Sequence, residues 1–304
     1  MVCGLTFNER QDAFFRILRE VSNPDLFFGC GLPQQQAFDW LLRDDGAQLC
    51  PDDDNLIQRY VLAVFYFSTN GDSWRECNAP FIFDPCEVTT PLSVEDANAA
   101  CTLTTVNATT IFPNDIRGSN AWLSPDSECL WGGVSCYATG TPNAGKVNVI
   151  EFEDNDLSGV LPSEMEQLDN MRFFALERGT ISGPIPSSYG NLNSLLLLDF
   201  DFNQLTGMIP SSLWDLTQLR QLDLNDNQLT GILSEFIGNL QQLRFFQIDN
   251  NNMVGTIPAS MGDIPNFSEY LSYDLSYDIL FLPPFVITQT LLSLTSSLVI
   301  IPEH

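Results

Sequence analysis

Apolar residues recur every 24 positions between residues 147 and 266. Glycines mark the register most clearly, at Gly159, Gly183, Gly207, Gly231 and Gly255. Proline follows three residues after four of these glycines, with Ser234 as the exception, and an apolar residue precedes each glycine by two. Four asparagines share the spacing, with Gly179 as the one substitute: Asn155, Asn203, Asn227 and Asn251. A fixed period of this length predicts stacked coils rather than one globular core.

Each unit is expected to contribute a short strand, such as residues 221–224, followed by a turn at the asparagine. The asparagine amide can satisfy backbone groups inside the bend. Glycine permits the tight turn, and the following proline prevents a long helix. Because no single unit can bury its own leucines, stacking has to create the core.

The segment before the repeats has a helical pattern. We expect helices at residues 8–20, 34–43 and 55–67, since apolar residues such as Phe14, Ile17 and Leu18 share one face of the first. The three aspartates 52–54 precede the third helix, where they are expected to cap it. They lack the alternating spacing of a calcium loop. Residues 77–121 show little periodicity and are interpreted as a disulfide-tied loop.

The net charge and the scarcity of basic residues exclude several classes of function. The chain of 304 residues has 39 acidic and 12 basic residues, a net charge of −27, with one lysine and one histidine, Lys146 and His304. A field of this sign repels phosphate backbones, so we expect no nucleic-acid partner. A lone terminal histidine excludes the usual hydrolase triads and histidine-based zinc sites. No cofactor and no metal site are assigned from these residues.

Eight cysteines lie within the first 136 residues, without any C-x-x-C pair. Their even number favours disulfides formed in an oxidising compartment, and buried reduced thiols are the alternative. Sequons at Asn107 and Asn266 are candidate glycosylation sites. The first residues contain no signal peptide. The chain is therefore expected to be extracellular or membrane-anchored with its leader missing, or else cytosolic.

The L-[ST]-G-x-[IL]-P signature at 157–162, 181–186 and 205–210 resembles that of plant-type leucine-rich repeat proteins, among them receptor ectodomains and secreted inhibitors of cell-wall-degrading enzymes. Their N-terminal cap motif C-x-W-x-G-V-x-C matches residues 129–136. The helical lead is similar to that of some microalgal members. The resemblance covers roughly residues 54–266. It implies an α/β solenoid, a right-handed coil of about five 24-residue repeats behind a helical, disulfide-containing cap. It also implies ligand recognition, and a Cys129–Cys136 disulfide with Trp131 packed on the first repeat.

Four regions follow from these patterns: a helical lead (1–67), a cysteine-rich cap (68–146), five repeats (147–266) and an irregular tail (267–304). The tail contains an uncharged run, 279–301, of which residues 285–301 lie beyond two prolines. Three interpretations of the tail stay open: a cover for the last repeat, a weak membrane anchor, or a sequence artefact that truncates the array.

Function is expected on the exposed face of the stacked strands, where columns of side chains can be read from the register. An apolar stripe beside an acidic ladder suits a protein or peptide ligand, and the carboxylates favour a basic one. Two alternatives remain: an acidic cell-wall or matrix protein that binds Ca²⁺ or polysaccharide, and a truncated receptor ectodomain. We expect no catalysis, because an open sheet should not raise a carboxyl pKa. The candidate binding residues are Glu151, Glu153, Phe173, Glu177, Asp199, Asp201, Phe202, Asp223, Phe245 and Asp249.

Overall fold

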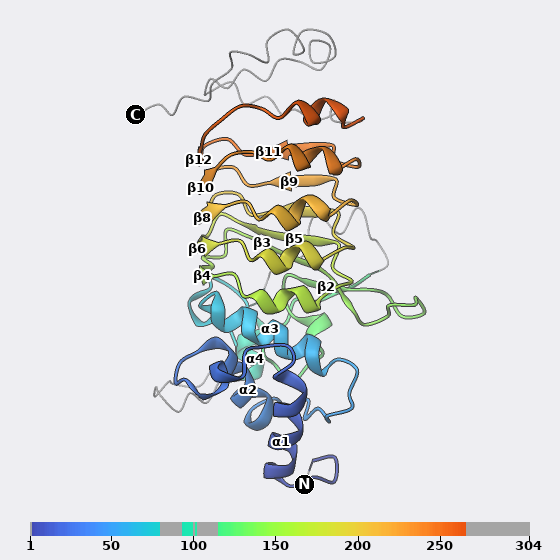
Figure 1. The fold of residues 1–304 in the computed structure, drawn as a ribbon. Coiled ribbons are helices and arrows are strands. Elements are labelled where there is room, and N and C mark those ends of the chain that lie inside the picture. The colour runs from blue at the N-terminus through green and yellow to red at the C-terminus, as the bar shows by residue number, and fades with distance from the viewer. Residues whose placement is uncertain (1, 80–92, 100, 102–114, 266–304) are drawn as a thin grey trace.

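The computed structural model describes residues 2–79, 93–99, 101 and 115–265. A helical region lies at the N-terminal end of a stack of coils, and the chain climbs the stack one coil at a time (Figure 1). The helical region contains α1 (Phe7–Leu18), η1 (Pro24–Phe28), α2 (Pro33–Arg43), α3 (Leu56–Ser68), η2 (Gly71–Ser73) and α4 (Val94–Ala99).

The three helices expected from the apolar pattern are all present. Thr6 and Glu9 form a capping box at the start of α1, in which each side chain accepts a hydrogen bond from the other residue's backbone N–H. Pro33 occupies the first turn of α2. The aspartates before α3 do not cap it, because Asn55 is its N-cap and makes no side-chain capping bond. Asp53 instead accepts from the backbone N–H of Cys50, which closes a local turn.

Two sheets run along the coils. The first contains, in spatial order, β1 (Ile116–Arg117), β2 (Val134–Cys136), β3 (Val147–Glu153), β5 (Phe173–Glu177), β7 (Leu197–Asp199), β9 (Gln221–Asp223) and β11 (Phe245–Gln247). Strands β3 to β11 are parallel, whereas β1 and β2 pair antiparallel. The second sheet is parallel and contains β12 (Asn252–Met253), β10 (Gln228–Gly231), β8 (Gln204–Met208), β6 (Thr180–Pro184) and β4 (Ser158–Val160).

Short 3₁₀ helices complete the coils, and successive ones from η4 onward pack on each other. Their bounds are η3 (Glu128–Leu130, in the cap), η4 (Ser163–Gln167), η5 (Ser187–Asn191), η6 (Ser211–Asp215), η7 (Glu235–Asn239) and η8 (Ala259–Asp263). Residues 24 apart are partners in the first sheet, for example Asp199 and Asp223 in β7 and β9. The predicted register is therefore confirmed.

One hydrophobic cluster runs from Phe14 in α1 to Ile264 at the last coil. The helical region covers the first coil through aromatic rings, since Trp74 and Trp122 lie 4.9 and 5.7 Å from the ring of Phe152 in β3. Trp131, expected to pack on the first repeat, contacts the rings of Trp40 and Trp122 and has the guanidinium of Arg59 over its ring. It belongs to the same hydrophobic cluster as Val147 and Ile150 of the first repeat.

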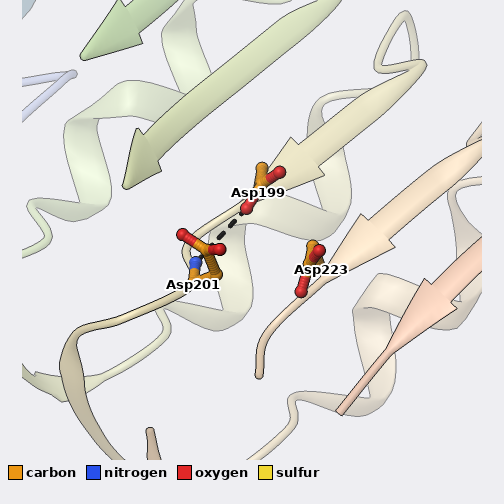
Figure 2. A group of neighbouring side chains, drawn as sticks. All are labelled: Asp199, Asp201 and Asp223. Carbon is orange, nitrogen blue, oxygen red and sulfur yellow. Dashed lines mark hydrogen bonds between the residues drawn. The ribbon is translucent and has the colours of Figure 1, made fainter. Parts of the chain in front are cut away.

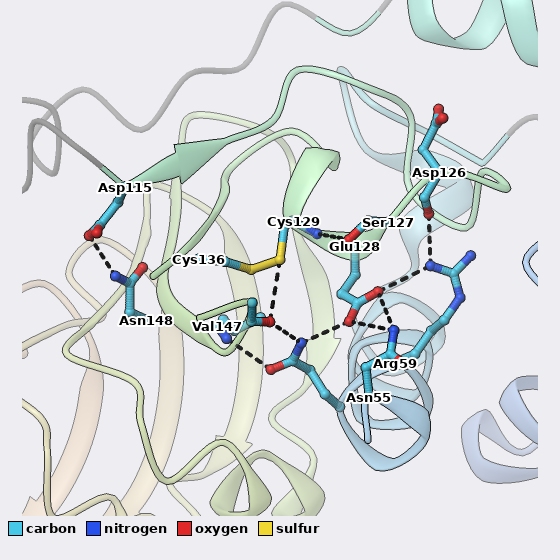
Figure 3. Close-up of a disulfide and its surroundings, with 12 residues drawn as sticks. Asn55, Arg59, Asp115, Asp126, Ser127, Glu128, Cys129, Cys136, Val147 and Asn148 are labelled. Carbon is cyan, nitrogen blue, oxygen red and sulfur yellow. Dashed lines mark hydrogen bonds and ion pairs between the residues drawn. A yellow bond between two sulfur atoms is a disulfide. The ribbon is translucent and has the colours of Figure 1, made fainter. Parts of the chain in front are cut away.

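The predicted Cys129–Cys136 disulfide is present (Figure 3). The Glu128 carboxylate beside it is buried and accepts hydrogen bonds from Asn55, Gln58 and Arg59 of α3 and its N-cap. Arg59 also pairs with buried Asp45 at 2.7 Å. Removing one partner of such a buried network leaves an uncompensated charge. This network therefore fixes the disulfide loop to the helical lead.

Two further disulfides join Cys3 to Cys50 and Cys77 to Cys101, and no described cysteine is a free thiol. The disulfide interpretation of the cysteines is thereby confirmed for the described residues. Both sequons, at Asn107 and Asn266, and the tail 267–304 with its uncharged run lie outside those residues. Among the helices that the structure describes, none has the length and hydrophobicity needed to cross a bilayer.

Candidate functional site

The exposed side of β3, β5, β7, β9 and β11, with the residues that follow each strand, presents a column of carboxylates. We call this surface the acidic face. It exists because alternate strand residues point away from the core and the parallel register places residues 24 apart side by side. Its seven carboxylates are Glu151, Glu153, Glu177, Asp199, Asp201, Asp223 and Asp249.

The carboxylates differ in exposure. Asp199 and Asp223 are only 7% and 5% exposed, and Glu151 is also buried. Glu177, Asp201 and Asp249 are half-buried, while Glu153 is exposed at one end of the face. The acidic face therefore has a buried centre on β7 and β9 and a more accessible rim.

The predicted aromatic anchors are not equivalent. Phe173 lies on the expected side of the sheet, outside the main core, but it is 5% exposed and packs with Val149, Leu196 and Leu197. It is therefore not an accessible anchor, because these apolar neighbours cover its ring. Phe245 is half-buried, and Phe202 is 44% exposed.

Burial raises the pKa of several of these carboxyls. Desolvation, with added repulsion from Asp223 and Glu177, raises the pKa of Asp199 to about 9. Desolvation likewise raises the pKa of Asp223 to about 7 and, helped by Asp201, that of Glu177 to about 7. The pKa of Asp201 rises to about 6 through desolvation, against the opposing effect of Arg178. The expectation that an open sheet leaves such pKa values unchanged is wrong, because carboxyl groups on neighbouring strands shield one another from solvent.

Three of the carboxylates form a compact cluster. Asp199, Asp201 and Asp223 each offer an oxygen, and these oxygens lie within 4.8 Å of one another (Figure 2). Asp199 and Asp223 stand on adjacent strands, and Asp201 follows β7 directly and donates its backbone N–H to Asp199 Oδ1. The repeat register predicts which side chains share a column. It does not predict that these three carboxylates lie so close together or that two of them are buried.

Arg178, at the turn after β5, is close enough to the cluster to oppose the rise in the pKa of Asp201. It pairs with Glu153 at 2.8 Å and lies over the ring of Phe202, with its Cζ 5.6 Å from the centroid. Arg172, directly before β5, pairs with Asp115 at 2.7 Å. Among the described residues, no arginine or lysine forms a salt bridge with Glu177, Asp199, Asp201, Asp223 or Asp249.

A second exposed surface was missed by the sequence reasoning. The residue after each repeat glycine projects from the second sheet, and Val160, Met208 and Ile232 are 49%, 70% and 69% exposed. Pro184 occupies the same position in the coil between Val160 and Met208 and is also exposed. The repeat register could have predicted this surface, because the position after the glycine is apolar in four successive repeats. Contiguous exposed apolar side chains are a feature of contact surfaces.

A family model described as Leucine Rich Repeat matches residues 194–216 and 218–240. No curated protein matches the chain. Among solved structures, the chain is similar to the BIR3–SERK2 complex from Arabidopsis thaliana, with 27% identity over 47% of this chain and 74% of that one, at a TM-score of 0.43.

The BIR2 ectodomain from Arabidopsis thaliana is 30% identical over 46% of this chain and 71% of its own, at a TM-score of 0.42. The ectodomain of the Arabidopsis receptor kinase GASSHO1/SCHENGEN3, in complex with CASPARIAN STRIP INTEGRITY FACTOR 2, is 33% identical. That match covers 47% of this chain and 17% of the receptor chain, at a TM-score of 0.43.

The family match falls on two of the five stacked coils, and all five share its spacing and strand register. This chain therefore belongs to the leucine-rich repeat proteins, with repeats of the plant type.

Proposed function

We propose that the chain is a non-catalytic recognition module that binds a basic protein or peptide segment through the acidic face. The observation that carries this proposal is the row of carboxylates on β5, β7, β9 and β11 without arginine or lysine partners among the described residues. Carboxylates that have no basic partner within the fold attract and orient a partner of opposite charge.

The rim of the acidic face supplies both parts of such a contact. Glu177 and Asp249 are half-buried carboxylates that a lysine or arginine side chain can reach. Phe202 and Phe245 add aromatic surface beside them. Aromatic anchors surrounded by polar groups are the usual composition of a protein-binding surface.

The disulfides support an extracellular or membrane-associated location. Three are formed within the described residues, and cysteine pairs of this kind persist in oxidising compartments. An extracellular recognition module of this form also suits the ectodomain of a longer receptor.

Binding can be tested with synthetic peptides of graded net charge, from acidic to basic, and constant apolar content, immobilised for interferometry. The proposal predicts saturable binding that increases with positive charge and weakens with ionic strength. The double variant Glu177→Gln with Asp249→Asn should bind the best peptide about tenfold more weakly, since it removes two rim carboxylates.

The matched control is Asp215→Asn with Asp263→Asn, which makes the same charge change at exposed positions in η6 and η8. The proposal expects this control to bind like the unmodified chain. An equal loss in both double variants would instead indicate diffuse attraction to an acidic wall or matrix protein, and would count against a defined site.

Glycoside hydrolysis is the rival function, because raised carboxyl pKa values also suit acid–base chemistry. The geometry disfavours it. Glycosidase carboxyls stand roughly 5–5.5 Å apart in retaining enzymes and about 6.5–9.5 Å in inverting ones. The cluster oxygens all lie within 4.8 Å, which leaves little room for a glycosidic bond between them. Release of reducing sugar from polyuronate or glucan, lost in Asp199→Asn, would overturn the non-catalytic proposal.

A further inference from the structure

We infer that Asp199, Asp201 and Asp223, with the side-chain carbonyl of Asn225, form a binding site for one Ca²⁺ ion at the centre of the acidic face. Oxygens within 4.8 Å of one another can share a single ion that lies about 2.4 Å from each. The inference does not depend on peptide binding, because its test uses the metal alone.

The first argument is charge without a counter-charge. Asp199 and Asp223 are more than nine-tenths buried, and burying an unpaired carboxylate is strongly unfavourable. Among the described residues, the cation that acts on the cluster is Arg178, which is already paired with Glu153, and the neutral Gln221 side chain donates a hydrogen bond to Asp199 Oδ2. The neighbouring carboxylates that repel cluster members are Glu177, Glu153, Asp226 and Asp249. Protons or a bound cation have to neutralise this group.

The second argument is independent of the carboxylates. Asn225 is 9% exposed, and its Oδ1 is buried without a hydrogen-bond partner among the described residues. Its backbone N–H donates to Asp223 Oδ1, and its backbone carbonyl accepts from the N–H of Phe202, the residue after Asp201.

The other end of the Asn225 side chain fixes its orientation. Its Nδ2 donates to Asp226 Oδ2 at 2.9 Å. Because the amide is planar, this contact turns the carbonyl oxygen away from Asp226, and the inference assigns this oxygen to the ion as a fourth ligand. Asp201 Oδ1 is likewise buried without a partner in the described part of the chain. One oxygen of the cluster itself and one amide oxygen are thus buried without a hydrogen-bond donor, as expected for ligands of an absent cation.

The ligand types select the metal. All four groups are hard oxygen donors, which suit Ca²⁺ or Mg²⁺ rather than zinc or copper. Mg²⁺ requires near-octahedral ligands at about 2.0–2.1 Å, whereas Ca²⁺ accepts irregular geometry at about 2.3–2.6 Å with water completing the shell. Oxygens held on two rigid strands at spans up to 4.8 Å fit the larger ion.

The experiment is calorimetric titration of Ca²⁺ into the chelator-treated chain at about pH 8. The inference predicts one saturable site. Asp199→Asn and Asp223→Asn should each weaken binding at least tenfold. Asp215→Asn, on η6 at the opposite side of the same coil, should leave it unchanged.

Thermal unfolding separates loss of the site from loss of the fold. Ca²⁺ should raise the Tm of the unmodified chain but not that of Asp199→Asn, while the metal-free variant should melt no lower than the metal-free parent. Failure to detect a saturable site, or Asp199→Asn binding as tightly as the parent, would overturn the inference. So would multiple weak sites abolished by moderate salt, as expected for diffuse attraction to the −27 surface.

Discussion

At the scale of single residues, the repeated asparagine explains how each coil closes. Asn227 Oδ1 accepts from the backbone N–H of Leu205 at 2.9 Å, and its Nδ2 donates to the carbonyl of Phe200 at 2.8 Å. Asn203 and Asn251 make the same pattern of contacts one coil before and after. The Asn227 amide also donates to the carbonyls of Leu224 and Asn225 inside its own bend, as the sequence predicted. The contacts with the preceding coil, which join neighbouring coils, were not predicted.

The substitution Asn227→Ala should lower the free energy of unfolding by about 3 kcal/mol, because it leaves buried backbone groups without partners. Chemical denaturation followed by circular dichroism measures this change. The control is Asn252→Ala, at an exposed position of β12, for which a change within about 0.5 kcal/mol is expected. Equal effects of the two substitutions would show that the buried amide has no special role.

Two positions depart from the repeat in ways that the sequence alone does not reveal. At Gly179, which replaces the asparagine, an added Cβ would lie 2.8 Å from Asn203 Oδ1 and 2.8 Å from the Leu157 carbonyl. Phe202 has a positive φ of 48°, in a position where Asp226 and Asn250 also have positive φ. Asp and Asn tolerate this conformation, whereas for a bulky Phe it is strained.

At the scale of elements, the sequence predicted the helices and the strand register well, because apolar spacing determines both. It did not predict exposure within a column. Phe173 and Phe245 occupy equivalent positions, yet Phe173 is covered by apolar neighbours and Phe245 is not fully buried. The carboxylates of β7 and β9 differ from those at the rim for the same reason, since burial depends on neighbours in adjacent coils.

The carboxyl columns of β5, β7 and β9 should make the metal-free chain less stable as pH rises. The folded-state pKa values of Asp201, Glu177, Asp223 and Asp199 are about 6, 7, 7 and 9, all above their ordinary values of 3.8 or 4.5. The folded state therefore binds more protons than the unfolded state in this range, so the free energy of unfolding falls from about pH 5 to about pH 9. Urea denaturation with a chelator present measures the slope.

Carboxyl groups with a lowered pKa do not change the stability between about pH 5 and about pH 9. Hydrogen bonds to Arg75 lower the pKa of Asp154, and hydrogen bonds to Thr6 lower that of Glu9, so their contributions are lost only in acid. Asp199→Asn should flatten the slope, while Asp215→Asn should preserve it. A stability that rises steadily between pH 5 and 9 would contradict the assigned burial of the columns.

At the scale of the whole molecule, the helical lead, the cap and the coils share one hydrophobic cluster. The lead covers the end of the solenoid that would otherwise expose apolar side chains, as capping units of stacked repeats do. The sequence indicated this arrangement through the cap motif, but not the aromatic contacts that form it. The net charge of −27 is distributed over a solenoid whose acidic face faces outward, and this surface is where we place function.

Carboxyl footprinting tests that placement most directly. The chain is labelled with carbodiimide and a neutral amine, with and without a bound basic peptide, and labelled sites are located by mass spectrometry. Our account predicts protection of Glu153, Glu177, Asp201 and Asp249, with unchanged labelling of Asp215 and Asp263 on η6 and η8. Protection confined to the 3₁₀ helices, or labelling of the acidic face unaffected by a peptide that binds, would contradict it.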